Sequence, residues 1–140
     1  MEKTLNIENK EINYLKAKDK RMNNLIYYIG EIKRKCNPKP FNALCRNIVY
    51  QQLSSQAADS IWSNFNNNLP ELTPAAIISA KKIELKETGL SERKIDYLNN
   101  LSEAVLNNQL VLPKLNQMTD QEIIKQLVKI KGIGQWTAEM

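Results

Sequence analysis

The segment best suited to binding chemistry is Lys131-Gly132-Ile133-Gly134, near the end of the chain. Two glycines beside an isoleucine let the backbone turn tightly and approach another molecule without interference from a Cβ atom. The segment leads into a predicted helix start at Gln135, where free amides and the helix dipole favour an anion. A nucleic-acid phosphate is the natural candidate, with Lys131 adding positive charge. The alternative is a glycine-rich turn that only joins two helices.

Several familiar kinds of catalytic chemistry are excluded because the 140 residues contain no histidine. Ser-His-Asp and Cys-His catalysis and histidine-ligated metals all require it. The phosphate-binding motifs GxGxxG and GxxxxGK[ST] are also missing. The two cysteines, Cys36 and Cys45, lack CxxC spacing and indicate neither a zinc site nor a disulfide framework. We therefore expect no metal and no cofactor, and we expect Cys45, within an apolar helical pattern, to be a buried thiol.

The composition indicates a globular chain with an excess of positive charge. Hydrophobic residues make up 42% of it, and the low aromatic content of 6% with only four glycines argues against all-β folds. The net charge of +5 is compatible with a polyanionic partner, although a bias toward Lys, Asn and Ile also contributes to it. No apolar run approaches the length of a membrane span, and the polar first twenty residues do not predict secretion.

The elements that must position the hairpin are predicted to be short helices. One continuous helical face follows i, i+3, i+4 spacing: Phe41, Leu44, Cys45, Ile48, Val49 and Leu53. Later helices are predicted to start at capping residues: Ser54, Thr73, Ser91 and Thr119. No segment has a convincing strand alternation, so the predicted fold class is all-α.

A break at Asn37-Pro38-Lys39-Pro40 separates two parts of the chain, because each proline disfavours helix at the residue before it. We expect a helical lead-in over residues 1–35, beginning with a ragged terminus. The main domain is expected over residues 36–140, with the hairpin over 120–140.

Three blocks of the sequence resemble one known family. They are LVKIKGIGQWTAEM (127–140), FNALCRNIVYQQLS (41–54) and GLSERKIDYL (89–98). The first strongly resembles the helix-hairpin-helix of DNA glycosylases, and the three together are similar to 3-methyladenine DNA glycosylase II. The resemblance implies the helix-hairpin-helix glycosylase fold, here incomplete at the C-terminus.

The implied function is DNA base excision repair of alkylated purines of the 3-methyladenine type. An enzyme of this kind flips the damaged nucleotide out of the duplex and hydrolyses its N-glycosidic bond. Bifunctional relatives carry a lysine where this chain has Trp136, so the resemblance implies no AP lyase activity. The implied partner is double-stranded DNA with alkylated bases, bound by a monomer without a membrane. The implied location is cytoplasmic and nucleoid-associated in a bacterium, or nuclear in a eukaryote.

The resemblance also implies roles for individual residues. Trp136 and Met140 fall at base-pocket positions, where an aromatic face suits a cationic base. Leu53 matches the wedge that fills the space of the flipped nucleotide, and Gln52 a contact to the orphaned base. The phosphate contacts are assigned to Lys131, Gly132 and Gly134. The alternative interpretations are a core tryptophan at position 136, core packing for Leu53 and a methionine core filler at position 140.

The resemblance places the catalytic aspartate about twenty residues beyond the hairpin tryptophan. The chain ends four residues after Trp136, so we expect a C-terminally truncated enzyme that is inactive in this form, with no catalytic residue within 1–140. Two other interpretations stay open. One is a non-enzymatic helix-hairpin-helix DNA-binding module, and the other is a structural all-α interaction domain.

Overall fold

A computed structural model describes residues 4–6, 9–30, 33–35 and 37–140. The chain divides into two compact units, Met1–Pro38 and Lys39–Met140, and each is described here by itself.

The first unit contains a helical hairpin and a short antiparallel strand pair. Its elements are β1 (Thr4–Asn6), α1 (Asn9–Lys18), α2 (Lys20–Ile29) and β2 (Lys33–Lys35), with Leu5 opposite Arg34. Asp19 lies between the two helices and caps the start of α2 by accepting a hydrogen bond from the Arg21 amide at 2.7 Å. A helical lead-in was expected, whereas the strands were not, because a three-residue strand is too short to display an alternating pattern.

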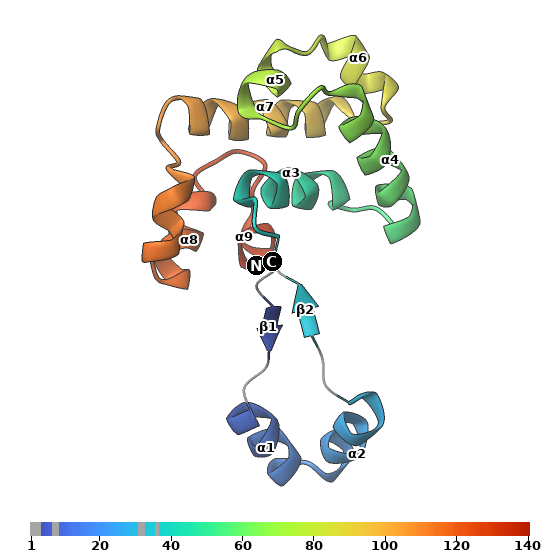
Figure 1. Cartoon of the computed structure of the whole chain (residues 1–140), viewed down its shortest axis with the longest axis vertical. Coiled ribbons are helices and arrows are strands. Elements are labelled where there is room, and N and C mark those ends of the chain that lie inside the picture. The colour runs from blue at the N-terminus through green and yellow to red at the C-terminus, as the bar shows by residue number, and fades with distance from the viewer. Residues whose placement is uncertain (1–3, 7–8, 31–32, 36) are drawn as a thin grey trace. The chain divides into compact units, whose positions relative to one another are not determined.

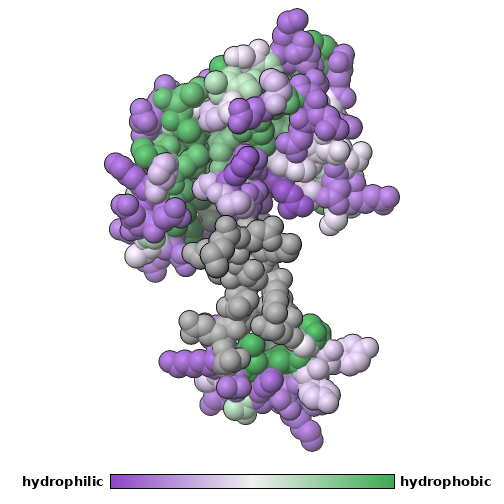
Figure 2. Space-filling view, viewed as in Figure 1, coloured by the Kyte–Doolittle hydropathy of each residue, from purple (hydrophilic) through white to green (hydrophobic). Residues whose placement is uncertain are grey.

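The helices α1 and α2 bury few of their apolar side chains against each other. Exposed members include Tyr14, Leu25, Tyr27, Tyr28 and Ile29. Figure 2 shows apolar side chains on the visible face of this hairpin, between polar and charged ones.

The second unit is entirely helical, which confirms the all-α prediction for this part of the chain. Its elements are α3 (Pro40–Tyr50), α4 (Ser55–Asn68), α5 (Pro74–Ser79), α6 (Lys82–Glu87), α7 (Glu92–Leu106), the 3-10 helix η1 (Leu112–Gln117), α8 (Asp120–Leu127) and α9 (Gln135–Glu139). The long helix α7 packs against α5 on one side and α3 on the other (Figure 1). The α8–α9 pair forms the predicted helical hairpin.

The predicted capping residues start their helices as expected. Ser54, Thr73 and Ser91 each accept a hydrogen bond from the backbone amide three residues later. At α8, Thr119 and Glu122 form a reciprocal capping box, with the Thr119 amide donating to the Glu122 carboxylate at 2.8 Å. These bonds satisfy helix N–H groups that have no partner within the helix, so the starts of the helices are set locally.

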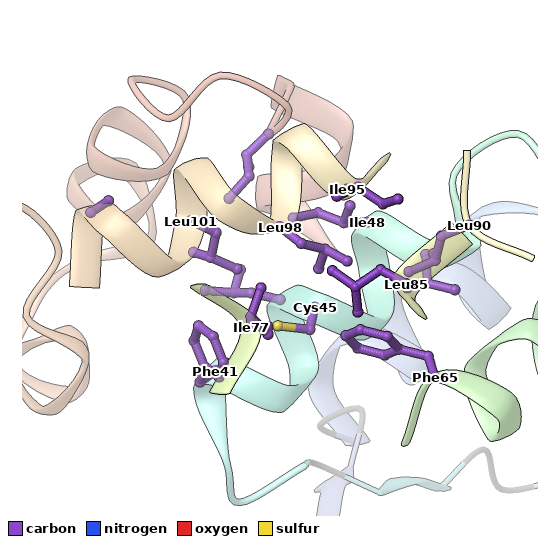
Figure 3. Close-up of a cluster of buried hydrophobic side chains, with 14 of the residues drawn as sticks. Phe41, Cys45, Ile48, Phe65, Ile77, Leu85, Leu90, Ile95, Leu98 and Leu101 are labelled. Carbon is purple, nitrogen blue, oxygen red and sulfur yellow. The ribbon is translucent and has the colours of Figure 1, made fainter. Parts of the chain in front are cut away.

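The core of this unit forms where α3 and α7 meet the short helices. Figure 3 shows Phe65, Ile48 and Leu98 among the buried side chains that come together from different helices. Cys45 is fully buried there, and this burial raises the pKa of its thiol above the usual range. The expectation of a buried structural thiol at Cys45 is therefore confirmed.

The apolar face of α3 ends earlier than the sequence pattern predicted. The helix stops at Tyr50, Gln51 is extended with φ −53° and ψ 128°, and Gln52 is left-handed with φ +57°. Leu53 therefore leaves the helical phase and lies outside the core, with 38% of its surface exposed. The prediction that it continues the stripe from Phe41 was wrong, because i, i+4 spacing carries no meaning once the helix has ended.

In the part of the chain that the structure describes, no helix has the length and apolar character needed to cross a membrane.

Phe65 provides the most direct test of this core because its side chain is fully buried. We expect Phe65→Ala to lower the free energy of unfolding by about 3–5 kcal/mol, since it removes apolar contacts and leaves a cavity. Chemical denaturation monitored by circular dichroism measures the change. Ile83→Ala is the matched control, because Ile83 is exposed on α6 and its truncation should cost less than about 1 kcal/mol.

Candidate nucleic-acid interface

The hairpin between α8 and α9 is anchored to the core by its central isoleucine. Ile133 is buried, and its amide donates to the Ile130 carbonyl at 3.0 Å. Asn100 on α7 donates to the Lys131 carbonyl at 3.2 Å, which ties the start of the turn to the same helix. The turn is thus fixed from its inner side, while Lys131 and Gly134 remain exposed.

Gly132 is required by the fold itself. Its backbone is left-handed with φ +108°, and a Cβ atom here would lie 2.2 Å from Cγ of Tyr97. Any other residue would meet both backbone strain and the Tyr97 ring. The close approach predicted from the sequence is therefore made, at this glycine, to another part of the same chain.

Gly134 lies under no such internal constraint. It has an ordinary φ of −83°, and a Cβ atom added to it would meet no other atom within 4 Å. Gly134 is the N-cap of α9 and provides no side-chain acceptor for the first helical amides. These amides point out of a helix start that has open space beside it, which is the arrangement an incoming anion needs.

The side chain of Gln51 joins the end of α3 to the hairpin. Its Nε2 donates to the Gly132 carbonyl oxygen at 2.9 Å and to the Thr137 hydroxyl at 3.1 Å. The residues after α3 and the first turn of α9 are therefore held together, although they are far apart in the sequence. The sequence offered no signal for this pair of bonds beyond the polar residue itself.

An open cavity of about 450 Å³ lies where these segments meet. Its lining residues come from α3, the turn after it, α7 and α9, and they are Asn47, Tyr50, Gln51, Gln52, Arg93, Tyr97, Trp136, Thr137 and Met140. The cavity has the size of a small-molecule site and is walled partly by aromatic rings.

Trp136 and Met140 both line this cavity and both have exposed side chains. For Trp136 the exposed fraction is 76%, an unusual value for the largest apolar side chain. The alternatives of a core tryptophan at position 136 and a core methionine at position 140 are therefore wrong. In α9 the adjacent Thr137 is buried, whereas the indole of Trp136 lies outside the core.

The turn after α3 brings two predicted site residues next to the cavity. Gln52 lines it, and the adjacent Leu53 is exposed. The left-handed backbone of Gln52 is uncommon for a residue with a side chain, and such backbone strain is concentrated at functional sites. An exposed leucine on a fixed turn fits a contact to another molecule better than core packing.

Two cations that sequence analysis did not assign to the site have defined partners within the chain. Lys94 donates from Nζ to the Val49 carbonyl at 2.6 Å, and its pKa is lowered by burial and by the nearby charge of Arg93. Arg46 lies over the Tyr50 ring at 3.9 Å from its centroid and 3.8 Å from the Asp59 carboxylate. The Tyr50 hydroxyl in turn donates to Asp59. These contacts fix the wall of the cavity.

No aspartate or glutamate is among the described residues that line the cavity. The described residues also contain no group of three or more metal-ligating side chains. What this cavity offers is aromatic surface, amide groups, a hydroxyl and a guanidinium.

The part of the chain that contains the α8–α9 hairpin matches a known family. The family of HhH-GPD superfamily base excision DNA repair proteins matches residues 45–138, a stretch that contains α4 to α8, the second half of α3 and most of α9. This chain belongs to the HhH-GPD superfamily. The helix-hairpin-helix predicted over 120–140 is thus the α8–α9 unit.

Individual relatives of this HhH-GPD chain support the same assignment. DNA-3-methyladenine glycosylase 1 of Schizosaccharomyces pombe is 32% identical over 134 residues, which are 91% of this chain and 59% of that relative. The structure of a DNA-3-methyladenine glycosidase from Bacillus halodurans has a TM-score of 0.80 at 32% identity, covering 99% of this chain and 64% of its own.

A further similar structure contains nucleic acid. The S. pombe 3-methyladenine DNA glycosylase Mag1, in complex with abasic DNA, has a TM-score of 0.85 at 28% identity, covering 92% of this chain and 66% of its own. The chain spans about three fifths to two thirds of the length of these relatives.

The two hairpin glycines of this HhH-GPD chain allow a paired test. We expect Gly132→Ala to lower the free energy of unfolding by about 2–5 kcal/mol, from backbone strain and from overlap with Tyr97. Gly134→Ala should change stability by less than about 1 kcal/mol, because its Cβ atom meets nothing within the chain.

The Gly134 variant also tests phosphate binding separately from folding. Gly134→Ala should weaken binding to duplex DNA, measured by fluorescence anisotropy, while the melting temperature stays near that of the parent chain. Unchanged DNA affinity in this variant would remove Gly134 from the phosphate contacts.

Proposed function

We propose that this chain is the lesion-recognition part of a monofunctional DNA glycosylase that excises alkylated purines. It binds damaged double-stranded DNA, and its cavity receives the base after the nucleotide has been turned out of the duplex. The observation that carries the proposal is the exposed Trp136, held on the wall of a 450 Å³ cavity beside the turn that carries Leu53.

Trp136 gives the cavity its preference for an alkylated base. Alkylation at a ring nitrogen makes a purine cationic, and a cation over an indole face gains about 0.5–2 kcal/mol. Tyr97 and Tyr50 add two more rings to the same wall. Met140 adds an apolar, polarisable contact at the C-terminal end of α9. A cationic base is also a good leaving group, so the site requires little acid catalysis.

Leu53 and Gln52 contact the duplex at the position from which the nucleotide has been turned out. The leucine wedges into the emptied space, as apolar side chains do when they enter from the minor groove. The neighbouring Gln52 then contacts the orphaned base. The fixed, exposed turn that carries both residues supports these roles.

The hairpin binds the DNA backbone. Lys131 contributes charge, and Gly134 lets a phosphate approach the first amides of α9. Gly132 contributes by shaping the turn, through its left-handed backbone against Tyr97. These contacts carry no sequence information and position the duplex for the cavity.

Bond cleavage needs a carboxylate to stabilise positive charge on the sugar. The described residues around the cavity include no carboxylate, so we propose that it comes from sequence outside residues 1–140. Residues 1–140 then recognise a lesion without releasing the base.

The tryptophan at position 136 in place of a lysine excludes a Schiff base at this position, so no strand cleavage follows. The protein acts as a monomer where the DNA is, in the bacterial cytoplasm or in a nucleus.

The second candidate function is a DNA-binding module without any enzymatic role. The cavity without a carboxylate is the observation that favours it. The two candidates differ in lesion preference, because a module that uses only the hairpin gains nothing from an extrahelical base.

The test compares a lesion duplex with the same duplex undamaged. The lesion is 2′-fluoro-7-methyldeoxyguanosine, which is cationic and resists cleavage because fluorine destabilises the positively charged sugar. We expect the chain to prefer the lesion duplex in anisotropy titrations. Trp136→Ala should reduce that preference about threefold to thirtyfold, the equivalent of a lost cation–π contact.

Tyr28→Ala is the control, because it removes an exposed aromatic side chain that does not line the cavity. It should leave the preference unchanged. Equal affinity of the parent chain for both duplexes would reject lesion recognition and favour the binding module.

A further inference from the structure

The first turn of α7 supports the strained turn that follows α3. Lys94 binds the backbone of this turn at the Val49 carbonyl, and the adjacent Arg93 donates from Nη2 to Gln52 Oε1 at 3.2 Å. Two consecutive cations of one helix therefore reach both ends of the segment that leads to Leu53. Arg93 also lines the cavity, so its contact to Gln52 lies at the candidate interface.

The contact with Arg93 determines which end of the Gln52 amide is free. A guanidinium has only donors, so the atom that faces it must be the amide oxygen. The amide nitrogen Nε2 of Gln52 has no hydrogen-bond partner among the residues that the structure describes. Gln52 therefore keeps both N–H donors of its amide free, while its oxygen is held toward the guanidinium with one lone pair occupied.

We propose that Arg93 is a positioning residue: it holds the Gln52 amide oxygen at the guanidinium, so that Nε2 is the group that contacts the base opposite the extracted nucleotide. This inference rests on the proposed function of the same site. In the minor groove every base offers an acceptor, N3 or O2, and guanine alone adds a donor, its N2 amino group. A contact made through Nε2 thus suits adenine, cytosine and thymine, whereas at guanine it leaves the N2 amino group beside an N–H donor and without an acceptor.

Removal of Arg93 changes the chemistry of the contact as well as its strength. Without the guanidinium, the Gln52 amide rotates freely and its oxygen can accept from the guanine amino group. The parent chain should bind weakest when guanine is the opposite base, and an Arg93→Ala variant should lose this discrimination. A residue that only stabilised the turn would weaken all four complexes equally.

The experiment measures affinity for duplexes that carry a tetrahydrofuran abasic-site analogue opposite each of the four bases. We expect the parent chain to bind the guanine duplex about threefold to tenfold more weakly than the other three. Arg93→Ala should weaken binding to those three and bring the four affinities to within twofold. Arg93→Lys keeps a donor for the Gln52 oxygen and should restore the discrimination.

Two further variants test whether the discrimination depends on the Arg93–Gln52 contact, and not on the loss of one positive charge or on a change in stability. Lys114→Ala removes one exposed cation that does not line the cavity and should keep the discrimination. Gln52→Gly relieves the left-handed backbone and removes the amide, so it should fold at least as stably and bind all four duplexes equally.

Two results would overturn the inference. One is an Arg93→Ala variant that still discriminates against guanine. The other is an equal loss on all four duplexes with a salt slope reduced by about 0.9, which would make Arg93 a phosphate contact. The proposed function fails separately, if the parent chain binds the abasic duplexes no more tightly than an intact one.

Discussion

The connection between the two parts of the candidate interface is the side-chain amide of Gln51, which reaches a hairpin already held by buried Ile133 and by Asn100. Its two hydrogen bonds, to the Gly132 carbonyl and the Thr137 hydroxyl, join segments 81 and 86 residues apart in the sequence. Each bond adds only about 0.5–1.5 kcal/mol to stability. Their structural effect is larger, because they set the position of the hairpin relative to the turn that carries Gln52 and Leu53.

Several other features follow from this connection. Helix α9 has only five residues, which is too short for a helix to be stable without packing, so its first turn needs the Thr137 contact. With Thr137 held inward, Trp136 is left outside the core and faces the cavity. Gly132 lies against Tyr97, where no larger residue fits. The Gln51 bonds, the Asn100 bond and buried Ile133 together hold the exposed indole and the glycine turn beside the cavity.

The parts of this arrangement that depend on local chemistry could be predicted from the sequence. Ser54, Thr73, Ser91 and Thr119 start helices because each satisfies an amide a few residues away. The apolar spacing likewise identified α3 and the buried thiol of Cys45. The hairpin was found from its glycines, and the family resemblance that it carried is confirmed by the match over residues 45–138.

What could not be predicted depends on contacts between distant segments. The early end of α3 placed Leu53 outside the core, and no local pattern marks the backbone reversal at Gln52. The cluster of Arg46, Tyr50 and Asp59 and the contact of Arg93 to Gln52 join separate helices. The roles of Gln52, Leu53, Lys131, Gly134 and Trp136 toward DNA remain proposals.

In the proposed function, Gln51 makes the turn after α3 and the hairpin into one DNA-binding surface. Nuclear magnetic resonance of the ¹⁵N-labelled chain, titrated with an abasic-site duplex, tests it most directly. In the parent chain, the amide signals of Leu53 and of Gly134 to Trp136 should shift together with one dissociation constant. In Gln51→Met, which keeps the side-chain length but has no donor, binding should weaken and the two groups of signals should no longer share one constant. A variant that keeps both the affinity and the common constant would contradict the claim.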